Sequence, residues 1–134
     1  MSERINGAVN GATSEEIRKA LSRGGLIDIT TVGRRSGELR RIEIAFQNIG
    51  GRIYVSGLPR REKRSWLANL EANPDFEFHL KGPVKADLAA KARVITDEAE
   101  RWQVLRQVAR NWRRADVDTM VRYSPLIEVT LALP

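Results

Sequence analysis

The chain has 134 residues and no cysteine, and its 23 Lys and Arg against 17 Asp and Glu give a formal net charge of +6. The length is that of one ordinary domain with a hydrophobic core, and the lack of cysteine excludes a disulfide scaffold and thiol chemistry. No apolar run approaches the roughly 18 residues that a membrane span needs. Residues 1–16 lack the apolar segment of a secretory signal, so we expect a cytoplasmic protein.

The excess positive charge lies in one part of the chain. Residues 34–64 contain nine Lys or Arg against three Glu, whereas the other residues hold fourteen of each sign. A solvated surface needs no such asymmetry, but an anionic partner would explain it. That partner could be a phosphate-bearing cofactor, a nucleic acid or a membrane surface.

The first half of the chain predicts a tail, a helix and three strands. Residues 1–12 show little apolar periodicity and predict a flexible tail. Thr13 and Glu16 form a capping box for a helix that the pair Gly24 and Gly25 ends. Alternation of apolar and polar residues then predicts strands, the last two joined by a turn at Gly50 and Gly51. These strands cover residues 26–32, 40–48 and 52–57.

The second half predicts two more helices, a short helical segment and three more strands. Trp66, Leu67 and Leu70 stand at helical spacing, and Asn73–Pro74 ends that helix. Asp97 caps the next helix. The remaining predicted elements are strands at 75–80, 84–95 and 125–133, a helix at 97–112 and a short helical piece at 115–122.

Six short strands joined mostly by turns predict an antiparallel sheet that curls into a barrel. We therefore expect a mainly β protein with peripheral helices (α+β), a split β-barrel of about six antiparallel strands. Residues 13–134 would form this single domain, because no linker or repeat divides them.

The connection between the first two strands is unusually basic. The stretch Thr30–Arg41, "TTVGRRSGELRR", places arginines between and after Gly33 and Gly37. Backbone N–H groups around such glycine turns can form an anion site, and arginine adds bidentate donors for phosphate or carboxylate. Arg40 and Arg41 must point to opposite faces of their strand, so at most one of them can serve this site. The alternative is a hairpin whose tip is basic by chance.

A second basic cluster, "SGLPRREKRSW", joins a strand to a helix. Lys63 and Arg64 stand at or near the first turn of that helix, where the helix dipole disfavours cations. Such a cluster makes better sense beside a bound anion, which gains from both the dipole and the basic side chains. The two basic loops could then converge on one anionic ligand.

Taken together, these stretches resemble the deazaflavin-dependent nitroreductase family. That family typically shows T-T-x-G-[RA]-[KR]-[ST]-G-x-x-R, a hairpin ending in Ser, and W-Y-H-N-L-x-A-N-P, and the resemblance spans residues 26–80 with matching spacing. It implies a split β-barrel of the FMN-binding-like class. It also implies that the reduced deazaflavin coenzyme F420 donates a hydride to a small organic acceptor. Members of this class are usually homodimers.

The resemblance also implies which residues contact the cofactor. Phosphate and tail contacts would fall on Arg34, Arg35, Ser36, Gly37, Arg40, Arg41 and Lys63. The deazaflavin ring would lie beside Val55, Ser56 and Gly57, and the helix signature is carried by Trp66 and Asn69.

This sequence departs from the family pattern where the acceptor would bind. Glu43 replaces a common proline, Leu67–Ala68 replaces Tyr-His, and the usual glycine-rich loop is "LPRRE". Tyr54 and Tyr123 are the only tyrosines, and Tyr123 is the candidate that could donate a proton to the acceptor. The cofactor class therefore carries over better than the substrate class.

The sequence leaves several alternatives open. The same barrel could hold FMN, haem or another ligand, or belong to a membrane-surface or fatty-acid-binding relative. A basic nucleic-acid-binding module is the alternative from another class, although few aromatic residues lie among the bases. With one histidine and no cysteine we expect no metal site. His79 is expected on the surface, and Trp102 and Trp112 are expected in core or interface packing.

Overall fold

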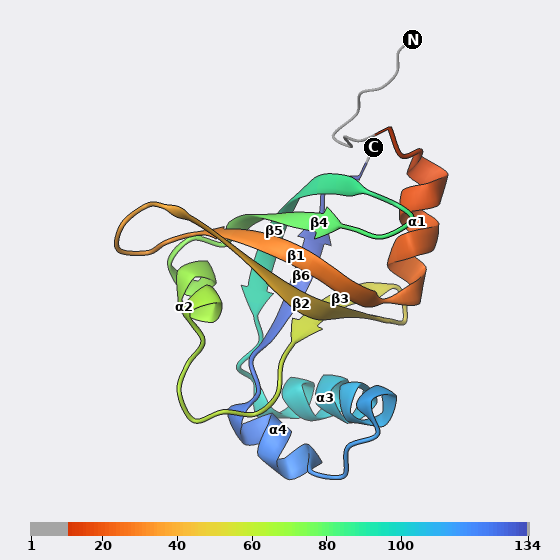
Figure 1. Ribbon diagram of the computed structural model, residues 1–134. Coiled ribbons are helices and arrows are strands. Elements are labelled where there is room, and N and C mark those ends of the chain that lie inside the picture. The colour runs from red at the N-terminus through yellow and green to blue at the C-terminus, as the bar shows by residue number, and fades with distance from the viewer. Residues whose placement is uncertain (1–10, 134) are drawn as a thin grey trace.

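The computed structural model describes residues 11–133, which form a closed barrel with four helices around it (Figure 1). The barrel order is β1-β2-β3-β6-β5-β4, and every neighbouring pair is antiparallel. This confirms the predicted fold class. The predicted tail lies outside the described residues, except for its last two. The elements are α1 (Ser14–Arg23), β1 (Gly25–Val32), β2 (Leu39–Ile49), β3 (Arg52–Ser56), α2 (Ser65–Ala72), β4 (Asp75–Leu80), β5 (Ala86–Val94), α3 (Glu98–Trp112), α4 (Val117–Tyr123) and β6 (Leu126–Leu131).

The alternation of β1 decides which of its side chains fill the barrel. Ile27, Ile29 and Thr31 are buried, whereas the residues between them face outward and are partly exposed, because successive side chains of a strand point to opposite faces. Phe78 of β4 pairs with Ile29 and meets the ring of Phe46 edge-on, with 5.3 Å between ring centroids. The alternation of apolar and polar residues that predicted this strand is confirmed.

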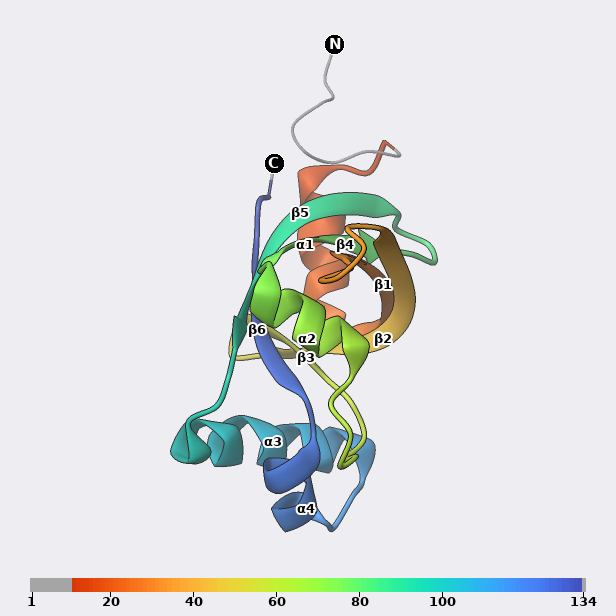
Figure 2. The same cartoon turned by 90° about the vertical axis from the view of Figure 1, so that its left-hand side faces the viewer.

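Helices α1 and α2 lie at opposite ends of the barrel, as the two views show (Figures 1 and 2). The predicted capping box is present in α1, with Thr13 Oγ1 accepting from the Glu16 N–H at 3.1 Å. Ile17 and Leu21 of α1 join the barrel core, and so does Trp66 of α2. Each helix therefore closes an end of the barrel with a few apolar side chains.

Helices α3 and α4 form a second layer beside the barrel (Figure 1). Leu105, Val108 and Met120 pack there with Tyr54 and Leu126 in a separate core cluster. The loop at residues 57–64 runs from the end of β3 past this layer to reach α2 (Figure 1). None of the helices in residues 11–133 is long and apolar enough to span a membrane.

Two expectations about single side chains need comment, and the surface position expected for His79 is wrong. Trp102 is 38% exposed, so it is not part of the core, and its place in an interface stays a prediction. His79 does face outward from the barrel, but it is only 3% exposed. Its Nδ1 lies 2.6 Å from Asp87 Oδ1 and its Nε2 lies 2.7 Å from Thr30 Oγ1. Side chains from the two neighbouring strands therefore cover the ring, which sequence alone could not show.

Candidate functional site

The β1–β2 turn has a shape that requires its glycines. The Gly33 N–H donates to the Glu38 carbonyl at 2.7 Å, and the Gly37 N–H donates to the Gly33 carbonyl at 2.8 Å. Gly37 has a φ of +76°, a backbone conformation that residues other than glycine rarely adopt. A Cβ at Gly33 would lie 3.0 Å from both the Glu38 carbonyl oxygen and Ser36 Oγ. The turn is therefore tightly specified by its own sequence.

Asn69 fastens this turn to α2. Its side chain is 3% exposed, and its Oδ1 accepts from the Arg34 backbone N–H at 3.1 Å and from Arg34 Nη1 at 2.9 Å. Its Nδ2 donates to Thr31 Oγ1 at 3.1 Å. The family signature residue Asn69 is thus a structural clamp, and the Arg34 guanidinium is already held by it.

Between the turn and α2 lies a cavity of about 380 Å³, here called the hairpin cavity. It contains three arginines, and none of the described residues that line it is acidic. Arg35 has no ion pair within residues 11–133, and Arg40 reaches only the exposed Glu38 at 3.4 Å. The lining residues are Thr31, Gly33, Arg34, Arg35, Ser36, Arg40, Ile42, Ser65, Trp66 and Asn69.

The N-terminus of α2 belongs to the same cavity. Its N-cap position is Arg64, which makes no side-chain capping hydrogen bond, and Ser65 and Trp66 of its first turn line the cavity. Helix N-termini carry unsatisfied N–H groups and attract anions. The hairpin cavity therefore combines arginine donors with an uncapped helix start.

Arg41 lies on the other face of β2, as the alternation of a strand requires. Its Nε donates to Asp28 Oδ2 at 3.0 Å, and Lys81 Nζ bridges Asp28 and Glu43. The hydrogen bond from Lys81, followed by the one from Arg41, holds the pKa of Asp28 below its ordinary value of 3.8. Arg41, which the resemblance placed among the cofactor contacts, does not line the hairpin cavity.

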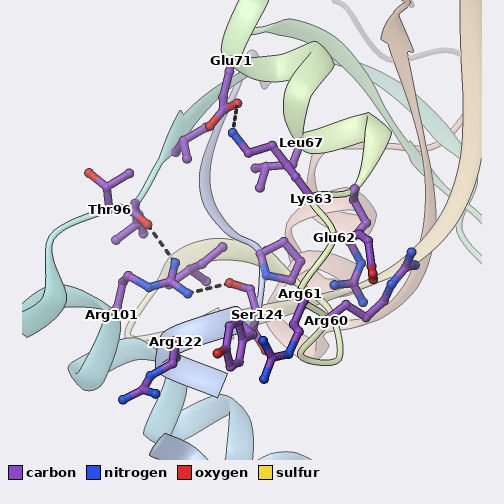
Figure 3. A pocket seen from close by; sticks show the side chains of 16 residues that line it. Arg60, Arg61, Glu62, Lys63, Leu67, Glu71, Thr96, Arg101, Arg122 and Ser124 are labelled. Carbon is purple, nitrogen blue, oxygen red and sulfur yellow. Dashed lines mark hydrogen bonds and ion pairs between the residues drawn. The ribbon is translucent and has the colours of Figure 1, made fainter. Parts of the chain in front are cut away.

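A second cavity of about 350 Å³ lies between residues 60–64, the end of α4 and the ends of β5 and β6; we call it the α4 cavity (Figure 3). Its lining includes six basic residues and two acidic ones, Glu62 and Glu71. The basic residues are Arg60, Arg61, Lys63, Arg64, Arg101 and Arg122. The two basic loops thus line separate cavities, so the structure does not bring them to one shared pocket.

The basic side chains of the α4 cavity are held in different ways. Lys63 pairs with Glu71, with 2.8 Å between Nζ and Oε1, so it does not reach the hairpin cavity (Figure 3). Arg61 stacks over the ring of Tyr123 at 5.5 Å from its centroid. Arg64 has no carboxylate partner among the described residues, and burial, together with neighbouring Arg60, lowers its pKa.

Val55, Ser56 and Gly57 sit deeper than the resemblance implies. Val55 is fully buried in the barrel core, and the buried Ser56 Oγ donates to the Pro125 carbonyl at 2.6 Å. A Cβ at Gly57 would lie 3.2 Å from Arg64 Nη2 and 3.3 Å from Pro125 Cγ. Neither strand side chain lines either cavity, and Gly57 makes room for Arg64 beside the α4 cavity.

Sequence reasoning missed two residues of this cavity. Arg101 of α3 donates to the carbonyls of Ile95 at 2.9 Å and Val121 at 2.8 Å, as well as to that of Ser124 (Figure 3). Ser124 is 4% exposed, and its Oγ has no hydrogen-bond partner among the described residues. An arginine within a helical stripe and a serine before a proline carry no distinguishing sequence signal.

The sequence matches the F420H2-dependent quinone reductase family over residues 2–127. The chain belongs to this family. Family membership makes it an oxidoreductase of the F420-dependent type, as the resemblance implied, and it gives no support to the FMN alternative.

Solved structures agree with the barrel. A conserved hypothetical protein from Mycobacterium tuberculosis aligns with a TM-score of 0.70 at 16% identity, over 97% of this chain and 86% of the other. An F420 reductase aligns with a TM-score of 0.62 at 16% identity, over 85% and 91%. The haem storage protein HutZ from Vibrio cholerae aligns with a TM-score of 0.63 at 16% identity, over 90% and 89%. At these identities the likeness concerns the fold alone.

Proposed function

We propose that this member of the family transfers a hydride from reduced F420 to a small organic acceptor of the quinone or nitroaromatic kind. The observation that carries the proposal is the hairpin cavity, in which Arg35 and Arg40 stand without an acidic lining residue beside the uncapped start of α2. F420 carries a phosphodiester and a polyglutamate tail, so its anionic part suits these donors.

The hairpin cavity fits the anionic part of the cofactor by the chemistry of its donors. Arg35 and Arg40 offer guanidinium groups that can bind phosphate or carboxylate oxygens bidentately. Ser36 Oγ accepts from the Glu38 N–H at 3.1 Å, which leaves its own proton available for a further oxygen. Arg34, fixed by Asn69, keeps the turn in place, and its charge adds to the field of the cavity.

We place the ring and the acceptor on the side of the α4 cavity. When bound in reduced form, F420 supplies a hydride, so the acceptor gains two electrons and needs one proton to complete its reduction. Tyr123 lines this cavity, and its phenol is the proposed proton donor. Leu67, Pro125 and Leu126 give the cavity an apolar side against which an organic acceptor can pack. A cytoplasmic location and a homodimer remain predictions.

The proposal is tested by turnover with defined acceptors. Purified protein is mixed with reduced F420 and either a simple naphthoquinone or a nitroimidazole, and the appearance of oxidised F420 is followed by absorbance. We expect acceptor-dependent oxidation of F420, with no turnover when reduced FMN or NADPH replaces it. Turnover with reduced FMN but not with reduced F420 would overturn the proposal.

A further inference from the structure

The α4 cavity holds more positive charge than its own acidic residues neutralise. Glu71 is engaged by Lys63, which leaves Glu62 as the other acid among the described lining residues. Arg60, Arg64 and Arg122 form no ion pair with any residue in the described range. The cavity therefore presents a positive field to whatever enters it.

The positive charge of Arg101 is held in a fixed position in this cavity. Its guanidinium donates to the carbonyl of Ile95, just after β5, and to those of Val121 and Ser124 at the end of α4. Figure 3 shows Arg101 beside Ser124. Carbonyl oxygens orient a guanidinium without cancelling its full charge, and no carboxylate of the described residues approaches it. Arg101 is partly buried, and this desolvation lowers its pKa. The cation is thus ordered before any ligand arrives, and ordering in advance favours binding.

Ser124 supplies an independent observation at the same place. Its hydroxyl is buried and lacks a hydrogen-bond partner within residues 11–133, although Ser124 lines the cavity. Buried hydroxyls are rarely left unpaired, because an unmade hydrogen bond costs free energy. Because Ser124 lines a cavity of cations, the natural partner for this hydroxyl, once its side chain turns toward the cavity, is an anionic oxygen from a ligand.

We propose that the α4 cavity binds the acceptor by a carboxylate or phosphate group, held by the Ser124 hydroxyl with Arg64 and Arg101, so that the physiological acceptor is an acid. The inference rests on the proposed function, which places the acceptor in this cavity. On the proposed function, the anionic part of F420 binds Arg35 and Arg40 in the hairpin cavity, which shares no lining residue with the α4 cavity.

The test compares an acid with its neutral ester. Protein saturated with oxidised F420 is titrated calorimetrically with a naphthoquinone carboxylic acid and with its methyl ester. We expect the acid to bind about tenfold more tightly or better, since hydrogen bonds to charged groups are the stronger kind. The variants Ser124→Ala and Arg64→Gln should each lower the acid-to-ester affinity ratio several-fold. Arg106→Gln, the same charge change at an exposed position of α3, should leave that ratio unchanged.

Urea unfolding without ligand distinguishes a ligand-binding role of Ser124 from a structural one. Ser124→Ala removes an unpaired hydroxyl, so the unfolding midpoint should stay the same or rise, whereas loss of a structural hydrogen bond would lower it. Equal binding of acid and ester by protein that binds F420 normally would overturn this inference and leave the proposed function intact. Displacement of F420 by the acid would also overturn it, because the cluster would then hold the cofactor. Failure to bind F420 at all would overturn both.

Discussion

The outer face of the barrel and the two cavities use arginine in contrasting ways. On the outer surface, Arg93 pairs with both Glu100 and Glu128, and Arg41 pairs with Asp28. In the cavities, Arg35 and Arg64 have no carboxylate partner within the described chain. The amino-acid composition does not distinguish these two groups of arginines. The difference in their partners separates charges that serve the fold from charges available to a ligand.

The two groups of arginines also differ in how much they stabilise the fold, because they differ in their partners and in their exposure to solvent. Exposed ion pairs contribute about 0–1 kcal/mol each, because water screens them and two long side chains lose freedom. An arginine in a cavity without a counter-charge adds no ion pair to the stability of the fold, yet it can form a strong hydrogen bond with an anionic ligand. Substitutions in the two regions should therefore affect different measurements.

The largest effect is expected from the double variant Arg35→Ala with Arg40→Ala. Each loses a charge-assisted hydrogen bond worth about 1.5–3 kcal/mol, so the affinity for oxidised F420 should fall at least tenfold while the unfolding midpoint stays unchanged. Fluorescence titration measures the affinity. Arg41→Ala, which removes an arginine of the same strand that pairs with Asp28, is the matched control and should change affinity less than threefold. Unchanged affinity in the folded double variant would contradict the assignment of the hairpin cavity to F420.

Asn69→Ala tests the clamp rather than a direct contact. The change removes the acceptor of Arg34 and the donor to Thr31 at a buried position, so we expect the free energy of unfolding to fall by about 1–3 kcal/mol. F420 affinity should fall with it, since the turn loses its attachment to α2. Asn69→Asp keeps an acceptor for Arg34 and should retain more affinity than Asn69→Ala. Equal loss of affinity in both variants would argue against the clamp.

Tyr123→Phe tests proton delivery in the α4 cavity. Positioned acids usually contribute a hundredfold or more, but water can replace the phenol in an open cavity, so we expect kcat to fall about tenfold. KM should change little, because the ring and its contact with Arg61 remain. Tyr54→Phe, at the buried tyrosine of the second core cluster, is the control and should leave kcat unchanged. A wild-type kcat in Tyr123→Phe would remove Tyr123 from the mechanism.

The smallest effect belongs to the outer face. The pKa of Asp28 is lowered in the folded protein, so its pairing with Lys81 and Arg41 stabilises the fold above pH 3.8, the ordinary value. That contribution disappears as the pH falls through the lowered folded value. Asp28→Asn should cost less than about 1 kcal/mol at neutral pH and nothing in strong acid. Urea unfolding across pH measures this, with the more exposed Asp75→Asn as control. A pH-independent cost would show that the ion pair is not its cause.

The sequence predicts the elements better than the contacts between them. The alternation in β1 and the caps at Thr13 and Asp97 are local signals, and the structure bears them out. The burial of His79 depends on Asp87 of the neighbouring β5 and on Thr30 of β1, which lies 49 positions away in the chain. No local pattern encodes such pairings.

The candidate site shows the same division between local and distant information. The opposite directions of Arg40 and Arg41 follow from strand geometry, and the basic turn is visible in the sequence. The clamp by Asn69 joins residues 35 positions apart, and the unpaired Ser124 hydroxyl depends on where α4 ends. The separation of the two basic loops into different cavities likewise depends on how α2 sits against the barrel.

The assignment of F420 to the hairpin cavity is tested by a fluorescence titration of the purified protein with oxidised F420, with FMN titrated in parallel and as competitor. We expect saturable binding of F420 that FMN does not displace, and an affinity that falls steeply in the Arg35→Ala, Arg40→Ala variant. Preferential binding of FMN would keep the barrel but contradict the deazaflavin chemistry. Binding of neither ligand would contradict the assignment of the hairpin cavity to a cofactor and return the basic stretch to the nucleic-acid alternative.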